Sequence, residues 1–146
     1  PLATSTNLVQ FLAEKEYLEG ASNKALLLQG QMTGLIDLLF RRDGKYYIAD
    51  YKSNFLGNSL TDYNDESIAH AMQSHQYHLQ YLIYTVAVHR MLKQKLPGYQ
   101  YETHMGGAYY LFLRGMNPQD SRGIFFTKPD LDTVARLDEL LGGING

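Results

Sequence analysis

Two apolar runs joined by a tight turn constrain this chain more than any other feature. The runs cover residues 35–40 and 46–52, and the dipeptide Asp43-Gly44 lies between them. Asp-Gly between apolar runs is the strongest short-range signal for a two-residue hairpin turn. With that turn, Asp37 lies directly opposite Asp50, and their Cβ atoms are roughly 5 Å apart on one face of the hairpin.

Two facing carboxylates repel each other, and the apolar neighbours on both faces predict that the hairpin is buried. Burying two like charges is costly unless a proton is shared or a cation lies between them. Lys52 projects from the same face as Asp50 because it is two residues further along the strand. Carboxylate oxygens suit a hard ion such as magnesium, and a nearby lysine can orient a water or stabilise an oxyanion. Asp37, Asp50 and Lys52 therefore form a candidate catalytic site.

Two plainer interpretations of the same residues remain open. In the first, Asp50 and Lys52 form an ordinary ion pair at the end of a hairpin, and Asp37 caps a turn. In the second, the chain is a hairpin-stabilised α/β domain that binds no metal.

The remaining pattern predicts a single mixed α/β domain whose sheet is covered on both faces. The expected elements are a helix over 8–20, a strand over 25–29, a polar loop over 54–66, a long helix over 67–95, strands over 108–114 and 123–127, and a last helix from the N-cap Asp130 through Leu141 to Gly142-Gly143.

In the long helix, Gln80 and Tyr84 are one turn apart, so their polar ends can reach the same point. His75 and His78 have a spacing that a zinc site can use, but a surface or phosphate-facing role is the simpler interpretation.

Composition narrows the function classes. The net charge of −2 provides no basic surface for gripping nucleic acid through bulk electrostatics. The chain has no cysteine, which excludes disulfides and thiolate zinc sites and is compatible with a reducing cytoplasm. No apolar run approaches membrane-spanning length, so we expect no membrane association. Phosphate-binding loops and nucleophile elbows are absent, which gives no support to an ATPase or a serine hydrolase.

The ordered motifs of the chain resemble those of the PD-(D/E)xK nuclease superfamily. More narrowly, they are similar to the C-terminal nuclease domain of the RecB family, the beta subunits of bacterial exodeoxyribonuclease V. The resemblance runs from about Gly30 to the C-terminal helix and rests on Gly34-Leu35-Ile36-Asp37, on Asp50 to Gly57, on the helical stretch Ala71 to Tyr84, and on Gly106 to Gly115. The proline that names the superfamily is replaced by Ile36.

The resemblance implies a restriction-endonuclease-like fold, a mixed central β-sheet flanked by α-helices. It also implies that Asp37 and Asp50 bind magnesium, or manganese in its place, and that the carbonyl of Tyr51 completes the coordination. Lys52 is then the catalytic lysine. Gln80 and Tyr84 correspond to an element that contacts substrate or supports the catalytic residues.

The implied function is a magnesium-dependent exodeoxyribonuclease within a helicase–nuclease, which hydrolyses DNA phosphodiester bonds during double-strand break repair by recombination. The implied partners are DNA, RecC-like and RecD-like subunits and a RecA-like recombinase.

One departure from the family pattern concerns the metal ligands. RecB-like nucleases take a further histidine ligand from an upstream helix, but no histidine precedes the hairpin here. We therefore expect residues 1–146, which open at Pro1, to be an excised nuclease domain that lacks this ligand. Glu14, Glu16 and Glu19 form a solvated face, or one of them substitutes for the missing metal ligand. The alternative function is a catalytically incomplete nuclease-fold module for subunit or RecA docking.

Overall fold

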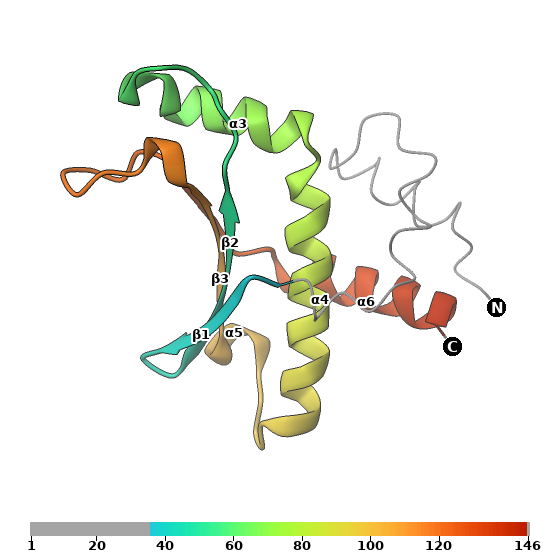
Figure 1. The fold of residues 1–146 in the computed structure, drawn as a ribbon. Helices are drawn as coiled ribbons and strands as arrows, with labels where there is room; N and C mark the ends of the chain where they lie inside the picture. The colour runs from blue at the N-terminus through green and yellow to red at the C-terminus, as the bar shows by residue number, and fades with distance from the viewer. Residues whose placement is uncertain (1–35, 146) are drawn as a thin grey trace.

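The computed structural model describes residues 36–145, which form a four-stranded mixed sheet with helices packed against it (Figure 1). The strand order is β1-β2-β3-β4, with β2 and β3 parallel and the two outer pairs antiparallel. The strands are β1 Leu38–Arg42, β2 Lys45–Lys52, β3 Met105–Phe112 and β4 Ile124–Thr127. The expected α/β class with a mixed, helix-flanked sheet is confirmed, but the expected cover on both faces is not seen among residues 36–145. The helix and strand expected over 8–20 and 25–29 lie outside the described residues.

The β1–β2 hairpin has the turn and the register that its sequence predicts. Asp43 and Gly44 both have positive φ angles, of 52° and 78°, as a type I′ turn requires. Arg42 pairs with Lys45 and Leu38 pairs with Ala49. The same register, continued by one residue, brings the segment before β1 alongside the C-terminal end of β2.

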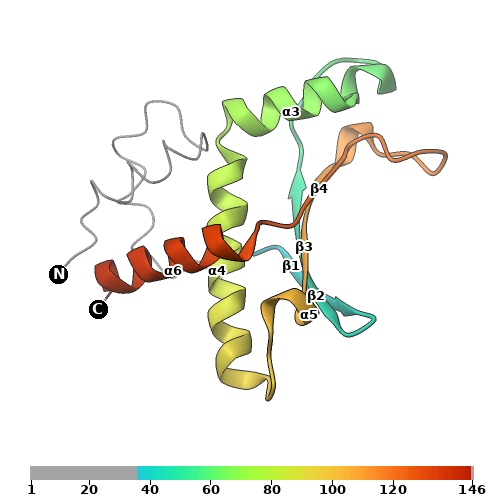
Figure 2. The ribbon, with the colours of Figure 1, turned by 180° about the vertical axis from the view of Figure 1, so that it is seen from behind.

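Most of the helices lie between β2 and β3 in the sequence, η3 lies between β3 and β4, and α6 follows β4. They are α3 Asp65–Ser74, α4 Tyr77–Lys95, α5 Tyr101–His104 and α6 Leu131–Asn145, with two short 3-10 helices, η2 Leu60–Tyr63 and η3 Leu113–Gly115. Helix α4 runs along one face of the sheet, and α6 crosses α4, as Figure 1 and the reverse view in Figure 2 show. Arg90 of α4 and Asp138 of α6 form an ion pair at this crossing.

The prediction of one continuous helix over 67–95 is wrong. Helix α3 ends at Ser74, and Gln76 has a left-handed backbone with a φ of 57° before α4 begins. No glycine or proline marks this break, so its cause is tertiary. The turn lets the ring of Tyr77 pack 5.4 Å from that of Tyr110 in β3, a contact that offsets the backbone strain at Gln76.

Several element boundaries also differ from the predictions. Helix α3 begins at Asp65, inside the expected loop, because the Asn64 side chain accepts a hydrogen bond from Ser67 N–H at 2.9 Å. Strand β3 begins three residues early and ends at Phe112, where η3 begins. Helix α6 starts after the predicted cap Asp130 but continues through its glycines to Asn145, since glycine weakens a helix without obligatorily ending it.

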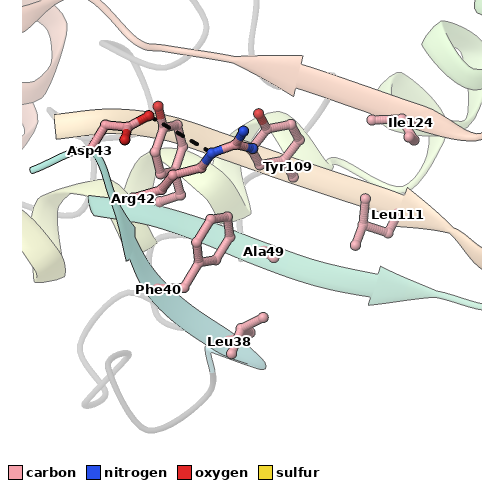
Figure 3. A pocket seen from close by; sticks show the side chains of 9 residues that line it. Leu38, Phe40, Arg42, Asp43, Ala49, Tyr109, Leu111 and Ile124 are labelled. Atoms are coloured by element: carbon pink, nitrogen blue, oxygen red, sulfur yellow. Dashed lines mark ion pairs between the residues drawn. The ribbon is translucent and has the colours of Figure 1, made fainter. Parts of the chain in front are cut away.

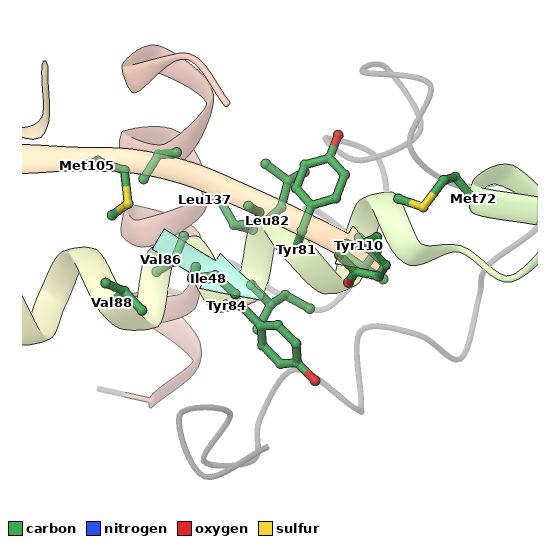
Figure 4. Packing of buried hydrophobic residues seen from close by; sticks show 14 of the residues in the cluster. Ile48, Met72, Tyr81, Leu82, Tyr84, Val86, Val88, Met105, Tyr110 and Leu137 are labelled. Carbon is green, nitrogen blue, oxygen red and sulfur yellow. The ribbon is translucent and has the colours of Figure 1, made fainter. Parts of the chain in front are cut away.

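The core lies between the sheet and α4. Ile48, Tyr110 and Leu82 are each fully buried there, and Leu137 of α6, which crosses beside α4, joins them. Figure 4 shows these side chains converging from β2, β3, α4 and α6. Because α4 is enclosed by both the sheet and α6, it is buried around most of its circumference, which explains why its apolar residues do not keep to one stripe.

The opposite face of the sheet is not covered by any helix of the described residues. It carries a hollow of about 400 Å³ near the β1–β2 turn (Figure 3). The hollow is lined by Leu38, Phe40, Arg42, Asp43, Tyr47, Ala49, Tyr109, Leu111 and Ile124. Phe40 and Tyr47 stack there with ring centroids 5.2 Å apart.

None of the helices in the described part of the chain is long and apolar enough to span a membrane.

Candidate active site

The charged end of β2 lies on the face that α4 covers. Strand alternation places Asp50 and Lys52 on this face, and Asp50 is only 3% exposed. Lys52 Nζ lies 2.5 Å from Asp50 Oδ2, and both side chains are largely shielded from solvent. This ion pair compensates the charge of the buried carboxylate. A carboxylate oxygen has more than one lone pair, so it can bind a cation in addition to the ammonium.

The ammonium group of Lys52 is held by a cage of polar and aromatic groups. It donates a hydrogen bond to Gln80 Oε1 at 3.0 Å, and Tyr110 O–H donates to the same oxygen at 2.6 Å. The Tyr77 ring centroid lies 4.1 Å from Nζ and presents its face to the cation. Lys52 is therefore fixed in position by groups from α4 and β3.

Asp37 occupies the position expected from the hairpin register, one residue before β1. Its Oδ2 accepts a hydrogen bond from Tyr51 N–H at 2.9 Å, which fixes the exposed carboxylate beside the end of β2. That backbone hydrogen bond is the main reason why the pKa of Asp37 is lowered, and a side-chain hydrogen bond to Asp50 lowers it further.

The pKa of Asp50 is shifted in the opposite direction. Burial raises it, the hydrogen bond with Lys52 opposes the rise, and the neighbouring Asp37 adds to it. Two interacting carboxyl groups with pKa values moved apart are the pattern expected when like charges share a site. Of the two carboxyl groups, Asp50 is therefore the one that takes up a proton first as the pH falls.

Gln80 and Tyr84 both approach this site from α4. Gln80 contacts Lys52 directly. Tyr84 is 2% exposed. Burial, followed by the negative charges of Asp50 and Asp37, raises the pKa of Tyr84 to about 12. The phenol therefore stays protonated at neutral pH and lies close enough to the carboxylates to sense their charge.

Sequence reasoning missed two residues of the site, Tyr110 and Tyr77. Tyr110 is paired with Asp50 in the parallel β2–β3 register, which no local pattern of the sequence reveals. Tyr77 follows the unexpected break before α4. The strongly apolar sequence of β3 indicated a buried strand but gave no sign that its tyrosine hydroxyl would orient Gln80.

The donor set fits a hard divalent ion in part. Asp37, Asp50 and the carbonyl of Tyr51 provide oxygen atoms, which magnesium prefers. Asp50 Oδ2 pairs with the Lys52 ammonium and retains a lone pair for such an ion. Across residues 36–145, however, no three His, Cys, Asp or Glu side chains gather to hold a metal. Glu14, Glu16 and Glu19 lie outside that range.

The two histidines with zinc-like spacing are engaged with aromatic side chains. The ring of His75 stacks on Tyr77 with centroids 5.3 Å apart, and His78 Nδ1 lies 3.1 Å from the Tyr81 hydroxyl.

Comparison of the sequence with those of known proteins identifies a family for this chain. Residues 4–142 match the PD-(D/E)XK nuclease superfamily. The chain is 50% identical over 111 residues to RecBCD enzyme subunit RecB of Haemophilus influenzae, covering 76% of this chain and 9% of that protein. It is 45% identical over 118 residues to the Escherichia coli subunit, covering 80% and 10%. For the Mycobacterium tuberculosis subunit the identity is 37% over 122 residues, covering 78% and 11%. The chain thus spans about a tenth of the length of these curated relatives.

Proposed function

Because the chain belongs to the PD-(D/E)XK nuclease superfamily, we propose that it is a magnesium-dependent DNA nuclease domain of a RecB-like subunit. The observation that carries the proposal is the buried Asp50–Lys52 pair, with Lys52 fixed by Gln80 and Asp37 anchored beside it. An ordinary structural ion pair does not need a second carboxylate held next to it, since the second charge destabilises the site.

In this proposal Asp37, Asp50 and the Tyr51 carbonyl hold magnesium, or manganese in its place. When bound, such an ion lowers the pKa of a water molecule and offsets negative charge on a phosphate. The Tyr51 N–H keeps the Asp37 carboxylate ionised and oriented, so that it is ready to bind a cation at neutral pH.

Lys52 supplies the positive charge that the reaction needs near the phosphate. Its ammonium donates hydrogen bonds to the attacking water or to a phosphate oxygen as negative charge develops. Gln80 Oε1 accepts hydrogen bonds from both the Tyr110 hydroxyl and the Lys52 ammonium. These two bonds hold the ammonium of Lys52 in one position at the site. Tyr84 stays protonated and supports Gln80 through a side-chain hydrogen bond.

At the level of the cell, we propose that the chain acts in the cytoplasm as an exodeoxyribonuclease during double-strand break repair by recombination. The names of its relatives support partnership with RecC-like and RecD-like subunits and with DNA. A RecA-like recombinase is a further proposed partner. If a helicase motor elsewhere in the protein delivers DNA to the site, the domain needs little affinity for DNA of its own. The net charge of −2 is compatible with such delivery.

A second candidate function is a nuclease-fold module that docks partner subunits or RecA and relies on residues outside residues 1–146 for catalysis. The observation that favours it is that the described residues contribute only two carboxylates to the site.

Cleavage of linear single-stranded DNA by the purified chain with magnesium tests the proposal. Lys52→Ala should reduce the rate by about 10²–10³-fold, the usual effect of removing a group that stabilises developing charge. Arg42→Ala is the matched control, because Arg42 is a solvent-exposed cation at the far end of the same hairpin. Equal rates for the wild type and Lys52→Ala would contradict the nuclease site. No cleavage by any form, followed by activity once a RecB-like upstream segment is supplied, would favour the docking module.

A further inference from the structure

Beyond Lys52, the chain leaves the sheet and exposes apolar side chains beside the candidate active site. The most exposed is Phe55, at 60%, only three residues after Lys52. Leu60 of η2 and Leu113 of η3 are 44% and 51% exposed, and these two 3-10 helices contact each other. Large apolar groups that gather on a surface usually mark a binding site.

A cation is fixed over Phe55. Arg114 Nε donates a hydrogen bond to the Ser53 carbonyl at 2.8 Å, and the guanidinium carbon lies 5.7 Å from the centroid of the Phe55 ring. Arg114 forms no ion pair with an acidic side chain of residues 36–145. Its charge is therefore held in place without being neutralised, and most of its N–H donors remain available to a ligand.

We propose that Phe55 and Arg114 form a subsite for single-stranded DNA, in which a base stacks on Phe55 and Arg114 contacts the adjacent phosphate. This inference rests on the proposed nuclease function and extends it to the nucleotides next to the scissile bond. Aromatic rings that stack bases, combined with arginine, are the usual means of holding a single strand without sequence preference.

The location of the pair supports DNA as the occupant rather than a protein. Three residues of extended backbone span at most about 10 Å. Asn54 and Leu56 turn toward α4 and the core, whereas Phe55 between them is exposed. A strand whose phosphate lies at Lys52 and which continues over the end of β2 therefore has a base within reach of Phe55.

The subsite also explains how a chain with a slightly negative net charge can bind DNA. A chain with a net charge of −2 cannot hold DNA through a broad basic surface. A single fixed arginine and an exposed ring provide local affinity for an unpaired strand instead. Bases inside a duplex are already stacked on each other, so the subsite selects single-stranded DNA or a frayed end.

The test measures the affinity of the chain for a fluorescently labelled single-stranded oligodeoxythymidylate by anisotropy, with calcium in place of magnesium to limit hydrolysis. Phe55→Ala should weaken binding by roughly tenfold, in the range typical of one lost base–aromatic stack. Phe55→Tyr should bind like the wild type because the ring is kept. Phe126→Ala is the matched control, since Phe126 is a 46% exposed phenylalanine in β4 that contacts Tyr109. Thermal unfolding confirms that each variant is folded.

A series of oligonucleotides that each lack one base separates stacking from other effects of the substitution. The wild type should lose affinity when one particular base is removed, and Phe55→Ala should be insensitive to the same removal. An unchanged affinity in Phe55→Ala, or an equal penalty for the missing base in both proteins, would overturn the subsite and favour a protein-docking role for the exposed residues.

The failure of this inference is distinguishable from failure of the proposed function. If Lys52→Ala abolishes cleavage while Phe55→Ala matches the wild type in affinity and rate, only the subsite is wrong. If the wild type neither binds nor cleaves single-stranded DNA, both proposals are overturned.

Discussion

The two faces of the same sheet contrast sharply in chemistry. On the face covered by α4, β2 ends in Asp50 and Lys52, an ion pair that is almost completely buried. On the opposite face, Phe40 stacks on Tyr47 and Tyr109, and these rings remain partly open to solvent. One strand contributes to both faces, because successive residues of a strand point in opposite directions.

The difference shows which groups need precise support. Stacked aromatic rings tolerate partial exposure, since they lose little when water replaces one neighbour. A buried carboxylate and ammonium need every remaining polar atom to be satisfied. Within residues 36–145, the α4 face has groups that do this, namely Gln80 and the Tyr110 hydroxyl, and we place the reaction there.

The largest expected effect comes from comparing two adjacent tyrosines of β3 that point to opposite faces. Tyr110 is fully buried, whereas Tyr109 is half-buried on the open face. Tyr110→Ala should lower the free energy of unfolding by about 3–5 kcal/mol, as is usual for large-to-small changes in a core. Tyr109→Ala should cost less than half of that. Urea denaturation of both variants checks the prediction, and equal losses would mean that the open face is packed in solution.

The two carboxylates of the site should respond to pH in opposite directions. The folded-state pKa of Asp50 is raised above the ordinary 3.8, so its contribution to stability falls as pH rises from 3.8 through the higher folded value. Asp50→Asn should therefore gain stability relative to the wild type across that range. The pKa of Asp37 is lowered, so its contribution is present above pH 3.8 and is lost as pH falls through the folded value.

Asp37→Asn should accordingly be less stable than the wild type at neutral pH, and the deficit should disappear in acid. The effect should be smaller than for Asp50, because Asp37 is solvent-exposed. Chemical denaturation between pH 2 and pH 7, roughly the range over which carboxylates titrate, measures both profiles. Parallel profiles for the two variants would contradict the assignment of the proton to Asp50.

A smaller effect is expected from removing a single hydroxyl. Tyr110→Phe deletes the hydrogen bond to Gln80 Oε1 and should cost about 1 kcal/mol of stability. It should also lower the cleavage rate severalfold, because Gln80 then orients Lys52 less well. Tyr109→Phe removes a hydroxyl from the opposite face and serves as the control. A rate unchanged by Tyr110→Phe would show that the orientation of Gln80 does not matter for catalysis.

The hairpin was predictable from local sequence, whereas the break before α4 and the role of Tyr110 depend on tertiary contacts. The turn at Asp43-Gly44 fixes the register of β1 and β2, and therefore the approach of Asp37 to the end of β2. The break before α4 and the contribution of Tyr110 were not predictable, because both depend on the parallel pairing of strands that are more than fifty residues apart in sequence. The contact between Gln80 and Lys52 followed only from the family resemblance.

The most direct test of the central claim is a magnesium titration of the chain followed by NMR at the Tyr51 amide, whose N–H binds the Asp37 carboxylate. We predict a saturable shift of that amide in the wild type and its loss in Asp50→Asn, since both carboxylates are needed to hold the ion. A Tyr51 amide that does not respond to magnesium, or that responds equally in Asp50→Asn, would contradict a metal-dependent nuclease site. It would leave the Asp50–Lys52 pair as an ordinary structural ion pair.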